Sequence, residues 1–244
     1  MKFLSIITPT YNSEKKILNC VNSVIDQNFG DYEHIIVDNC SSDQTMNLVN
    51  NINNKKIKTI SENDNGIYYA MNKGAEISSG EYLLFLNSDD YLIDKNFFLN
   101  SSNILKQKKF DIFYSNIIYE KTIFNFKRKY ISGKVLNKIK LGWHLPHPGT
   151  IINRNFFKKM NYFNTEYKIS SDFDFFIRSQ LKNDTKYYYY NYYTLNMSHG
   201  GVSSGLKNII KSNFECYRSL KMNRYRLPGL FIIMKLIRKF FQFI

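Results

Sequence analysis

The sequence has little cysteine, which cross-links chains, and little proline or glycine, which interrupt helices and strands. Among 244 residues there are three cysteines, four prolines and eleven glycines. Cys20, Cys40 and Cys216 are odd in number, far apart and without a Cys-x-x-Cys pair, so the sequence indicates neither a disulfide framework nor a thiolate zinc site. We therefore expect a protein of a reducing cytosol. Scarce proline and glycine, with 43% hydrophobic residues, exclude collagen-like and disordered chains and predict a globular core.

Long apolar runs are also missing. No stretch of 18 uninterrupted apolar residues occurs, so a membrane-spanning helix is not expected. The apolar residues 3–7 run directly into a polar segment without a small-residue cleavage site, which is typical of a strand and not of a signal peptide.

Acidic residues are outnumbered by basic ones. Asp and Glu total 20 against 34 Lys and Arg, a formal net charge of +14, which suits nucleic acid, an anionic membrane or a negatively charged substrate. Residues 205–244 hold nine Lys or Arg and a single acid, so most of the excess lies in this tail. A nucleic-acid-binding protein would spread its basic residues over one face of the fold. Because the excess lies in the tail, we expect no nucleic-acid partner. A basic nucleic-acid-binding protein is the alternative.

The first hundred residues alternate short β-branched runs with amphipathic segments. We predict buried parallel strands at residues 3–8, 34–38, 57–60 and 82–86, separated by helices at 14–27, 45–52 and 66–77. This order predicts a doubly wound α/β sheet, in which ligands bind beyond the carboxyl ends of the strands. Beyond residue 99 we predict a helix to about residue 109, strands at 111–119, 122–130, 151–153 and 186–193, and a helix at 171–181.

Polar clusters follow the four predicted parallel strands, at residues 8–12, 38–43, 62–66 and 87–90, so we expect them to converge on one crevice. Residues 87–90 read Asn-Ser-Asp-Asp, and oxygen ligands of this kind can hold a divalent cation that also binds a diphosphate. The same residues are common turn formers and helix caps, and that alternative stays open. An acid at the end of the second strand, Asp38, can accept hydrogen bonds from a base or ribose.

A second acidic segment opens the helix predicted at 171–181. Asp172 and Asp174 lie in its first turn, where carboxylates favour the helix dipole and where a rigidly held carboxylate can also act as a general base. The sequence has no G-x-G-x-x-G after its first strand and no G-x-x-x-x-G-K-[ST], so neither a dinucleotide site nor a P-loop is indicated.

Together these segments resemble family 2 glycosyltransferases with the GT-A fold, in particular the small bacterial enzymes that build surface polysaccharides such as O-antigen, capsule or colanic acid. The resemblance covers residues 3–204, and the matching segments occur in the family's order at 5–12, 37–45, 61–74, 80–90, 147–150, 172–178 and 200–203. It implies an α/β GT-A domain at 1–204, with a nucleotide-sugar half at 1–100 and an acceptor half at 101–204, followed by a basic helical tail at 205–244.

The resemblance also implies roles for particular residues. Asp89 matches the last position of the family's D-x-D motif and would bind Mn2+ or Mg2+, with Asp90 beside it. Asn87 stands where the pattern has its first acid, which removes one charge. Asp172 matches the catalytic base, because Arg178 completes the D-x5-R spacing that Asp174 does not fit. Donor contacts are expected from Thr8, Tyr11, Asp38, Asp64, Asn87 and Ser88.

Two histidines, His147 and His199, lie near the expected acceptor side. Each is a candidate metal ligand or phosphate partner, and a structural hydrogen bond is the alternative for either one.

By this resemblance the protein would be an inverting, metal-dependent hexosyltransferase. It would move a sugar from a nucleotide diphosphate sugar, most often a UDP-sugar, to a hydroxyl of a lipid-linked glycan at the cytoplasmic face of the inner membrane. A nucleotidyltransferase that makes activated sugars is the alternative enzyme. It would need a glycine-rich phosphate loop after the first strand, and residues 9–13 form no such loop.

The tail ends in an amphipathic pattern. In residues 229–244 the polar side chains Lys235, Arg238, Lys239 and Gln242 recur at i, i+3, i+4 and i+7 among apolar residues, which predicts a helix with a narrow basic face. Such a helix suits the surface of an anionic membrane. Packing against the domain or against a second subunit in a homo-oligomer are the alternatives.

Overall fold

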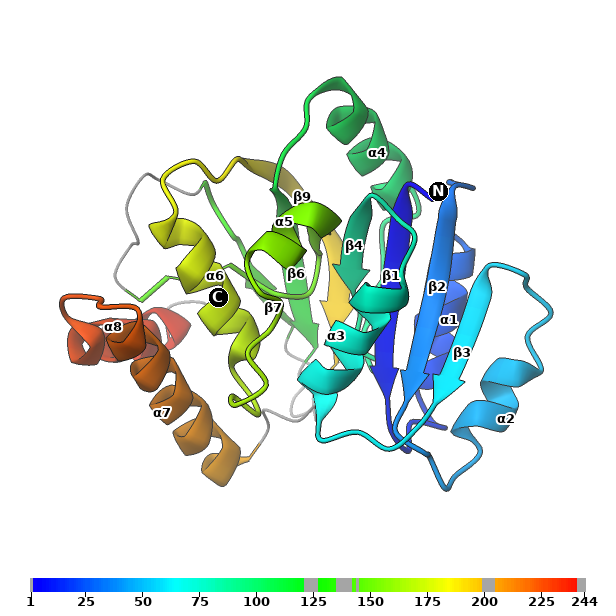
Figure 1. The fold of residues 1–244 in the computed structure, drawn as a ribbon, viewed down its shortest axis with the longest axis horizontal. Helices are drawn as coiled ribbons and strands as arrows, with labels where there is room; N and C mark the ends of the chain where they lie inside the picture. Colours follow the sequence, from blue (N-terminus) through cyan, green and yellow to red (C-terminus); the bar gives the residue numbers. More distant parts are fainter. Residues whose placement is uncertain (1, 121–126, 135–141, 144, 199–204, 241–244) are drawn as a thin grey trace.

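The computed structural model describes residues 2–120, 127–134, 142–143, 145–198 and 205–240. Within them the strands form one mixed sheet in the order β3-β2-β1-β4-β8-β6-β9-β5, with β7 paired to β6 (Figure 1).

The first hundred residues build the parallel part of this sheet, as predicted. β1 pairs with β2 and β4, and β2 pairs with β3, all in parallel register. The helices lie between these strands in the chain, as a doubly wound sheet requires. The elements are β1 (Leu4–Thr10), α1 (Ile17–Ile25), β2 (Tyr32–Asp38), α2 (Thr45–Asn50), β3 (Ile57–Ser61), α3 (Ile67–Ile77) and β4 (Tyr82–Phe85).

The following residues extend the sheet in mixed register. β4 and β6 both pair with β8 in antiparallel register, and β9 runs parallel to β6 and antiparallel to β5. The sequence did not predict β5 or α5, and part of the strand predicted at 122–130 lies outside the described residues. The elements are β5 (Tyr91–Leu92), α4 (Phe97–Gln107), β6 (Ile112–Glu120), β7 (Lys127–Tyr130), β8 (Thr150–Asn153), α5 (Arg154–Lys159), α6 (Ser171–Leu181) and β9 (Tyr187–Met197).

Helices cover both faces of the sheet. One buried cluster joins α1 and α4 to one face, and α3, α5 and α6 pack on the other, where Figure 1 shows them in front of the strands. Helix α3 packs closely on β1 at Gly74, where a Cβ atom would overlap the side chain of Ile7. Near the carboxyl end of β4 the ring of Phe85 packs on Phe163 at 5.0 Å, and Phe163 packs on Phe175 of α6 at 5.6 Å. This apolar layer fixes α6 against the parallel strands.

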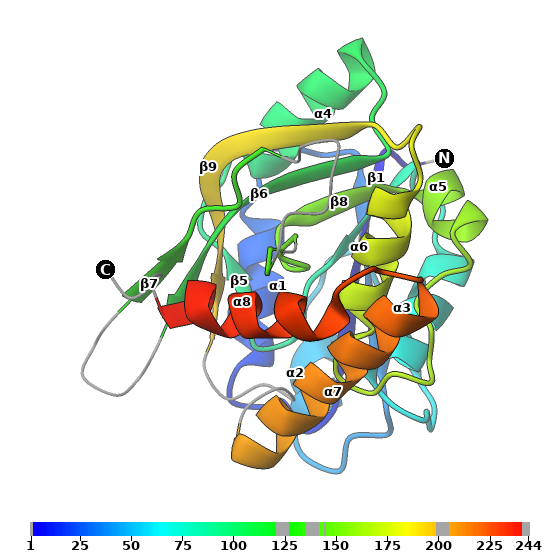
Figure 2. The same cartoon turned by 90° about the vertical axis from the view of Figure 1, so that its left-hand side faces the viewer.

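The tail expected to be helical at 205–244 forms two helices, α7 (Leu206–Met222) and α8 (Pro228–Phe240), and the second corresponds to the helix predicted at 229–244. Figure 2 shows α7 and α8 beside α6, and α8 is anchored by Phe231, whose buried ring contacts Phe173 at 5.7 Å and Tyr225 at 5.5 Å. The tail therefore packs on the domain. None of the helices in the described ranges is long and apolar enough to cross a membrane.

The predicted basic face of this helix needs correction. Lys235 points toward α7, where its Nζ donates to Oδ1 of Asn213 at 3.4 Å and to Sγ of Cys216 at 3.1 Å. Its ammonium also lies over the ring of Phe173. The side chain of Lys239, and Gln242 altogether, lie outside the described residues. The side chains that α8 exposes to solvent are largely apolar: Leu230, Ile233, Leu236 and Ile237.

Candidate active site

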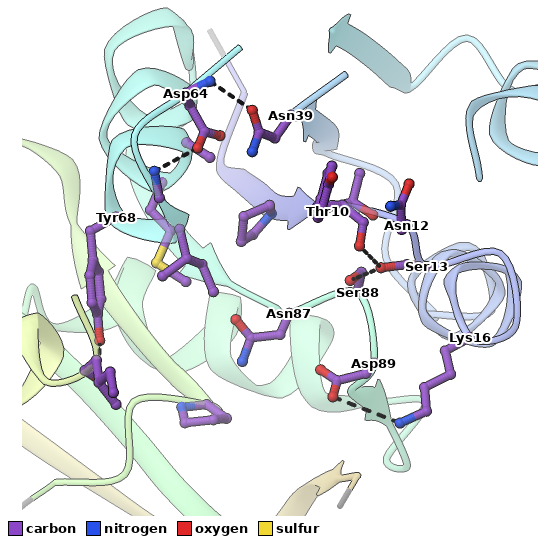
Figure 3. Close-up of a pocket in the computed structure, with 18 of the residues that line it drawn as sticks. Thr10, Asn12, Ser13, Lys16, Asn39, Asp64, Tyr68, Asn87, Ser88 and Asp89 are labelled. Atoms are coloured by element: carbon purple, nitrogen blue, oxygen red, sulfur yellow. Dashed lines mark hydrogen bonds and ion pairs between the residues drawn. The ribbon is translucent and has the colours of Figure 1, made fainter. Parts of the chain in front are cut away.

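A cavity of about 840 Å3 lies at the carboxyl ends of the parallel strands (Figure 3). The loops after β1, β2, β3 and β4 all contribute to its wall, and the start of α6 closes the opposite side. This is the crevice that the sequence predicted. Of the predicted site residues, those that line it are Tyr11, Asp64, Asn87, Ser88, Asp89, His147 and Asp172.

Hydrogen bonds tie these loops to one another. Asn12, whose φ of 46° is left-handed, accepts the backbone N–H of Ser42 on its Oδ1 at 2.9 Å. The hydroxyl of Ser13 lies 2.9 Å from that of Ser88, which joins the loop after β1 to the loop after β4. Figure 3 shows Ser13 and Ser88 meeting at the same wall of the cavity. The wall is therefore held by polar contacts that do not depend on a ligand.

Two predicted donor-binding residues lie beneath this surface. Thr8 is buried, with its Oγ1 2.9 Å from Nε2 of His34. Asp38 is also buried, and Oδ2 of its carboxylate accepts the backbone N–H of Ser41 at 3.0 Å and the hydroxyl of Ser61 at 2.6 Å. Neither side chain lines the cavity. Thr10 and Asn39 line it instead.

Asp64 lies at the cavity wall beside Asn39. Its backbone N–H donates to Oδ1 of Asn39 at 2.7 Å, and its own Oδ1 accepts the N–H of Gly66 at 2.7 Å. Gly66 has a φ of 130°, a conformation that favours glycine. Partial burial raises the pKa of Asp64, and the nearby carboxylates of Asp38 and Glu62 add to that rise.

The segment 87–90 divides into residues that line the cavity and one that does not. Asn87, Ser88 and Asp89 line the cavity, whereas Asp90 is buried and does not. Asp90 accepts Nδ2 of Asn87 at 3.0 Å and the backbone N–H of Ser198 at 3.1 Å. Burial and the neighbouring Asp89 raise the pKa of Asp90 well above its usual range. Asp90 therefore supports the loop from behind.

Asp89 faces the ammonium group of Lys16. Nζ of Lys16 lies 3.9 Å from its Oδ2, and Figure 3 shows this pair at the end of the cavity away from Tyr68. Burial raises the pKa of Asp89, and the Lys16 ammonium counteracts that rise.

The oxygen atoms here suit a hard divalent cation. Oδ1 of Asn87 is buried and has no hydrogen-bond partner in the described part of the chain, and the Asp89 carboxylate faces the same cavity. The described residues hold no cluster of three or more His, Cys, Asp or Glu that could bind a metal without help. Mg2+ and Mn2+ can be held by one or two protein oxygens together with substrate phosphates, so the donor set fits an ion that binds with a diphosphate.

Asp172 occupies the other side of the cavity, on the first turn of α6. The hydroxyl of Tyr68 lies 2.9 Å from its Oδ1 and 2.8 Å from the carbonyl oxygen of Ile169. Burial, together with the Asp172 charge, raises the pKa of Tyr68 well above its usual range, so this hydroxyl stays protonated and can orient the carboxylate.

Asp174 has a different environment. It is buried, and its Oδ2 accepts Nε of Arg178 at 2.7 Å while its Oδ1 accepts the hydroxyl of Ser219 at 2.7 Å and Nδ2 of Asn223 at 3.2 Å. It does not line the cavity. The structure thus presents Asp172, and not Asp174, to a ligand.

His147 also lines the cavity. It is buried between Phe85, with ring centroids 5.6 Å apart, and Phe163, at 5.3 Å. Its Nε2 has no partner among the described residues, and burial lowers its pKa, which favours a neutral ring. His199, the other predicted histidine, lies outside the described residues, as do residues 200–203.

Several cavity residues were not singled out from the sequence, among them Thr10, Lys16, Asn39, Tyr68 and Lys168. A signal for Lys16 was present, since it lies at the start of a helix after the first strand, where anions often bind. Tyr68 carried no such signal, because its contact with Asp172 spans 104 residues.

Comparison with known proteins supports the family resemblance seen in the sequence. The sequence profile described as "Glycosyl transferase family 2" matches residues 5–185. The poly(ribitol-phosphate) beta-N-acetylglucosaminyltransferase TarS of Staphylococcus aureus is 41% identical over 97 residues, which is 38% of this chain and 17% of TarS. A PGL/p-HBAD biosynthesis glycosyltransferase of Mycobacterium bovis is 28% identical over 71% of this chain and 68% of that protein. The putative teichuronic acid biosynthesis glycosyltransferase TuaG of Bacillus subtilis is 39% identical over 36% of each chain.

Solved structures share the fold. S. aureus TarS 1–349 in complex with UDP-GlcNAc superposes with a TM-score of 0.74 and 22% identity, over 98% of this chain and 72% of that one. Mannosyltransferase PcManGT from Pyrobaculum calidifontis, in complex with GDP-Man and Mn2+, gives a TM-score of 0.68 with 13% identity, over 96% of this chain and 69% of that one. The predicted GT-A architecture is confirmed by these likenesses.

Proposed function

The chain belongs to glycosyl transferase family 2, and from that premise we propose that it transfers a sugar from a UDP-sugar to a hydroxyl of a cell-surface polymer. Two relatives are named for poly(ribitol-phosphate) and for teichuronic acid, which supports a cell-wall polymer as the acceptor. The TarS complexes with UDP and UDP-GlcNAc support a UDP-sugar donor, with N-acetylglucosamine as the first sugar to test.

One observation carries the proposal. A single cavity has Asn87, Asp89 and Lys16 at one end and Asp172 with its partner Tyr68 at the other. A diphosphate needs oxygen-bound metal or cationic groups, and an acceptor hydroxyl needs a base. The two requirements are met on opposite sides of the same space.

The donor would lie along the ends of the parallel strands. In our proposal Tyr11, Asn39 and Asp64 surround the nucleoside, since they belong to the loops after β1, β2 and β3. Ser88 and Lys16 would contact the diphosphate, and Mn2+ or Mg2+ would be held by Asp89 and Oδ1 of Asn87. When bound, such an ion neutralises charge that develops on the departing diphosphate.

Asp172 would act on the acceptor. It accepts the proton of the acceptor hydroxyl as that oxygen forms a bond to the anomeric carbon, while the bond from this carbon to the diphosphate breaks and UDP leaves. A single displacement of this kind inverts the anomeric configuration. Tyr68 holds the carboxylate in place through its bond to Oδ1.

The experiment combines a donor panel with the Asp172→Asn variant. UDP release from a set of UDP-sugars would be measured with water in place of the acceptor, and UDP affinity by calorimetry. We expect Asp172→Asn to lose about 10²- to 10⁴-fold in turnover while UDP affinity stays unchanged, because the base acts on the acceptor. Glu166→Gln, which changes an exposed acid near the start of α6, is the matched control and should behave as wild type.

Full turnover by Asp172→Asn would contradict the assigned base. Absence of turnover by the wild-type protein with every UDP-sugar, together with absence of UDP binding, would contradict the proposed donor.

We also propose that the enzyme works at an anionic membrane, where a lipid-linked acceptor would lie. Helices α7 and α8 expose large apolar side chains, the most exposed of which are Leu206, Met222, Ile210, Phe214 and Ile233. Helix α7 and its connection to α8 expose basic side chains at Lys207, Lys211, Arg218, Lys221, Arg224 and Arg226. Exposed apolar groups with cationic neighbours are the combination that favours an anionic interface.

A further inference from the structure

The segment that leads into the proposed base is held by a side chain from beyond the family-matched residues. Glu215 lies on α7, whereas the family profile ends at residue 185. Its Oε1 accepts the backbone N–H of Lys168 at 3.0 Å, and its Oε2 accepts those of Ile169 and Ser170, each at 2.9 Å. Glu215 is buried, so these bonds are shielded from water.

Helix α6 has no local cap that could do the same. Ser170 stands at its N-cap, but the Ser170 side chain makes no capping bond within the helix, and its Oγ lies 2.8 Å from that of Ser212 on α7. Backbone N–H groups at a helix start need an acceptor. Glu215 supplies a charged acceptor to the three N–H groups just before α6, and bonds to a carboxylate are stronger than those to a neutral group.

The held segment reaches the reacting groups directly. Lys168 and Ile169 line the cavity together with Asp172. The hydroxyl of Tyr68 lies between the carbonyl oxygen of Ile169 and Oδ1 of Asp172, at 2.8 and 2.9 Å. A change in the backbone at residues 168–170 would therefore move both the Asp172 carboxylate and the hydroxyl that orients it.

We infer that Glu215 is a positioning residue for sugar transfer, which fixes residues 168–170 and thereby aims Asp172 at the acceptor. The inference rests on the proposed function, because it takes Asp172 as the base. It places part of the catalytic apparatus on α7, an element outside the family-matched part of the chain.

Two substitutions test it. Glu215→Ala removes the acceptor, and Glu215→Gln keeps the shape and one acceptor oxygen. Glu166→Gln is the matched control, because Glu166 also joins the segment before α6 to α7, through an exposed ion pair with Arg218 at 2.8 Å, but accepts none of these backbone bonds. For each protein we would measure kcat for UDP release from the UDP-sugar that wild type hydrolyses fastest, UDP affinity by calorimetry, and Tm.

We expect Glu215→Ala to lower kcat by about 10²-fold, as a misplacement of roughly 1 Å does, while UDP affinity is unchanged. Glu215→Gln should fall between Glu215→Ala and wild type, and Glu166→Gln should match wild type. When Glu215→Ala is added to Asp172→Asn, we expect no further loss, because residues that act as one unit are not additive.

The inference is overturned if folded Glu215→Gln and Glu215→Ala keep the wild-type kcat, or if the losses from Glu215→Ala and Asp172→Asn multiply. Should Glu215→Ala fail to fold, the kcat of Glu215→Gln is compared with that of Glu166→Gln, and equal values overturn the inference. Failure of the proposed function gives a different pattern, since Asp172→Asn alone would then retain the wild-type rate.

Discussion

At the scale of single residues, the asparagine at position 87 leaves Asp89 as the one carboxylate of the segment 87–90 that lines the cavity. Asp89 also faces the Lys16 ammonium. A cation must compete with that ammonium and has few protein ligands, so its binding should depend on the diphosphate.

We therefore expect Mn2+ to bind well only when UDP is present, and Asp89→Ala to weaken that binding by about tenfold or more, since the loss of an outer-shell partner alone commonly costs that much. UDP-sugar turnover should stop in EDTA and return with Mn2+ or Mg2+. Calorimetric titration of Mn2+ into the protein with and without UDP measures the first effect. Asp26→Ala, which changes an exposed acid paired with Lys95, serves as the control. Full turnover in EDTA would contradict the metal role.

Buried His34 gives the protein a pH-dependent stability. Burial lowers its pKa to about 3 from an ordinary value of 6.5, so the folded protein keeps the ring neutral where the unfolded chain protonates it. The contribution is complete above pH 6.5 and is lost as the pH falls from 6.5 toward 3. The free energy of unfolding should drop by at most about 1.4 kcal/mol per pH unit in this range from His34 alone.

Urea unfolding at pH 7, 6, 5 and 4 measures this dependence. In His34→Gln the amide can keep the bond to Thr8 without titrating, so its free energy of unfolding should fall less steeply below pH 6.5. Equal slopes for the two proteins would show that His34 does not carry the effect.

The two threonines of β1 show where residue-level prediction stops. Thr8 and Thr10 point to the same face of the strand, because side chains alternate, and the sequence cannot separate them. What separates them is depth, since Thr8 contacts His34 and Cys20 of α1 while Thr10 stands at the strand end by the cavity. Tyr11, Asp64, Asp89 and Asp172 were placed at the cavity because they follow strands or open a helix, positions that a sequence does reveal.

At the scale of elements, α6 depends on Asp174. This buried carboxylate joins Arg178 on its own helix to Ser219 and Asn223 at the end of α7. Asp174→Ala would leave Arg178 without its carboxylate, and we expect a loss of about 3 kcal/mol in the free energy of unfolding. Asp172→Ala, two residues away and facing the cavity, should change stability far less. Thermal or urea unfolding of both variants compares them, and equal stability of the two would contradict this division of roles.

Element length explains which elements the sequence missed. The strands and helices from β1 to β4 were predicted from their apolar patterns. β5 has only two residues, too short for a period to be recognised, and the short α5 follows β8 with no residue between them. Helix α5 starts where Asn153 accepts the N–H of Phe156 at 3.0 Å, which is a local helix cap. Because asparagine is common throughout the chain, a single Asn does not predict such a cap. β9 runs past its predicted end at 193 to Met197, because β6 and β5 both pair with it there.

At the scale of the whole molecule, the two terminal helices should decide membrane binding. We expect the double variant Ile233→Asp and Leu236→Asp to lose most of its binding to vesicles that contain anionic lipid, since charged groups at these exposed apolar positions oppose insertion. Co-sedimentation with anionic and with neutral vesicles measures this. Ile77→Asp, at an exposed apolar position on α3, is the control. If the double variant binds anionic vesicles as well as wild type does, the exposed apolar side chains of α8 do not bind the membrane.

The predicted boundary at residue 205 stays a prediction. Charge patterning separated the tail because its basic residues stand apart from the rest, but patterning says nothing of what a helix packs against. Phe231 and Lys235 contact Phe173 of α6, and Glu215 holds the segment before α6. Long-range contacts of this kind cannot be read from one sequence.

The position of Glu215 in the chain also sets an order of events during synthesis. Chains emerge from the ribosome with the N-terminal end first, so the parallel part of the sheet and α6 are available before α7 exists. Glu215 follows the backbone N–H groups that it accepts by 45 to 47 residues. A nascent chain that has completed its nucleotide crevice still lacks the contact that fixes residues 168–170. It could hold a nucleotide before it could aim its base, so competence for transfer would arrive only once α7 is added.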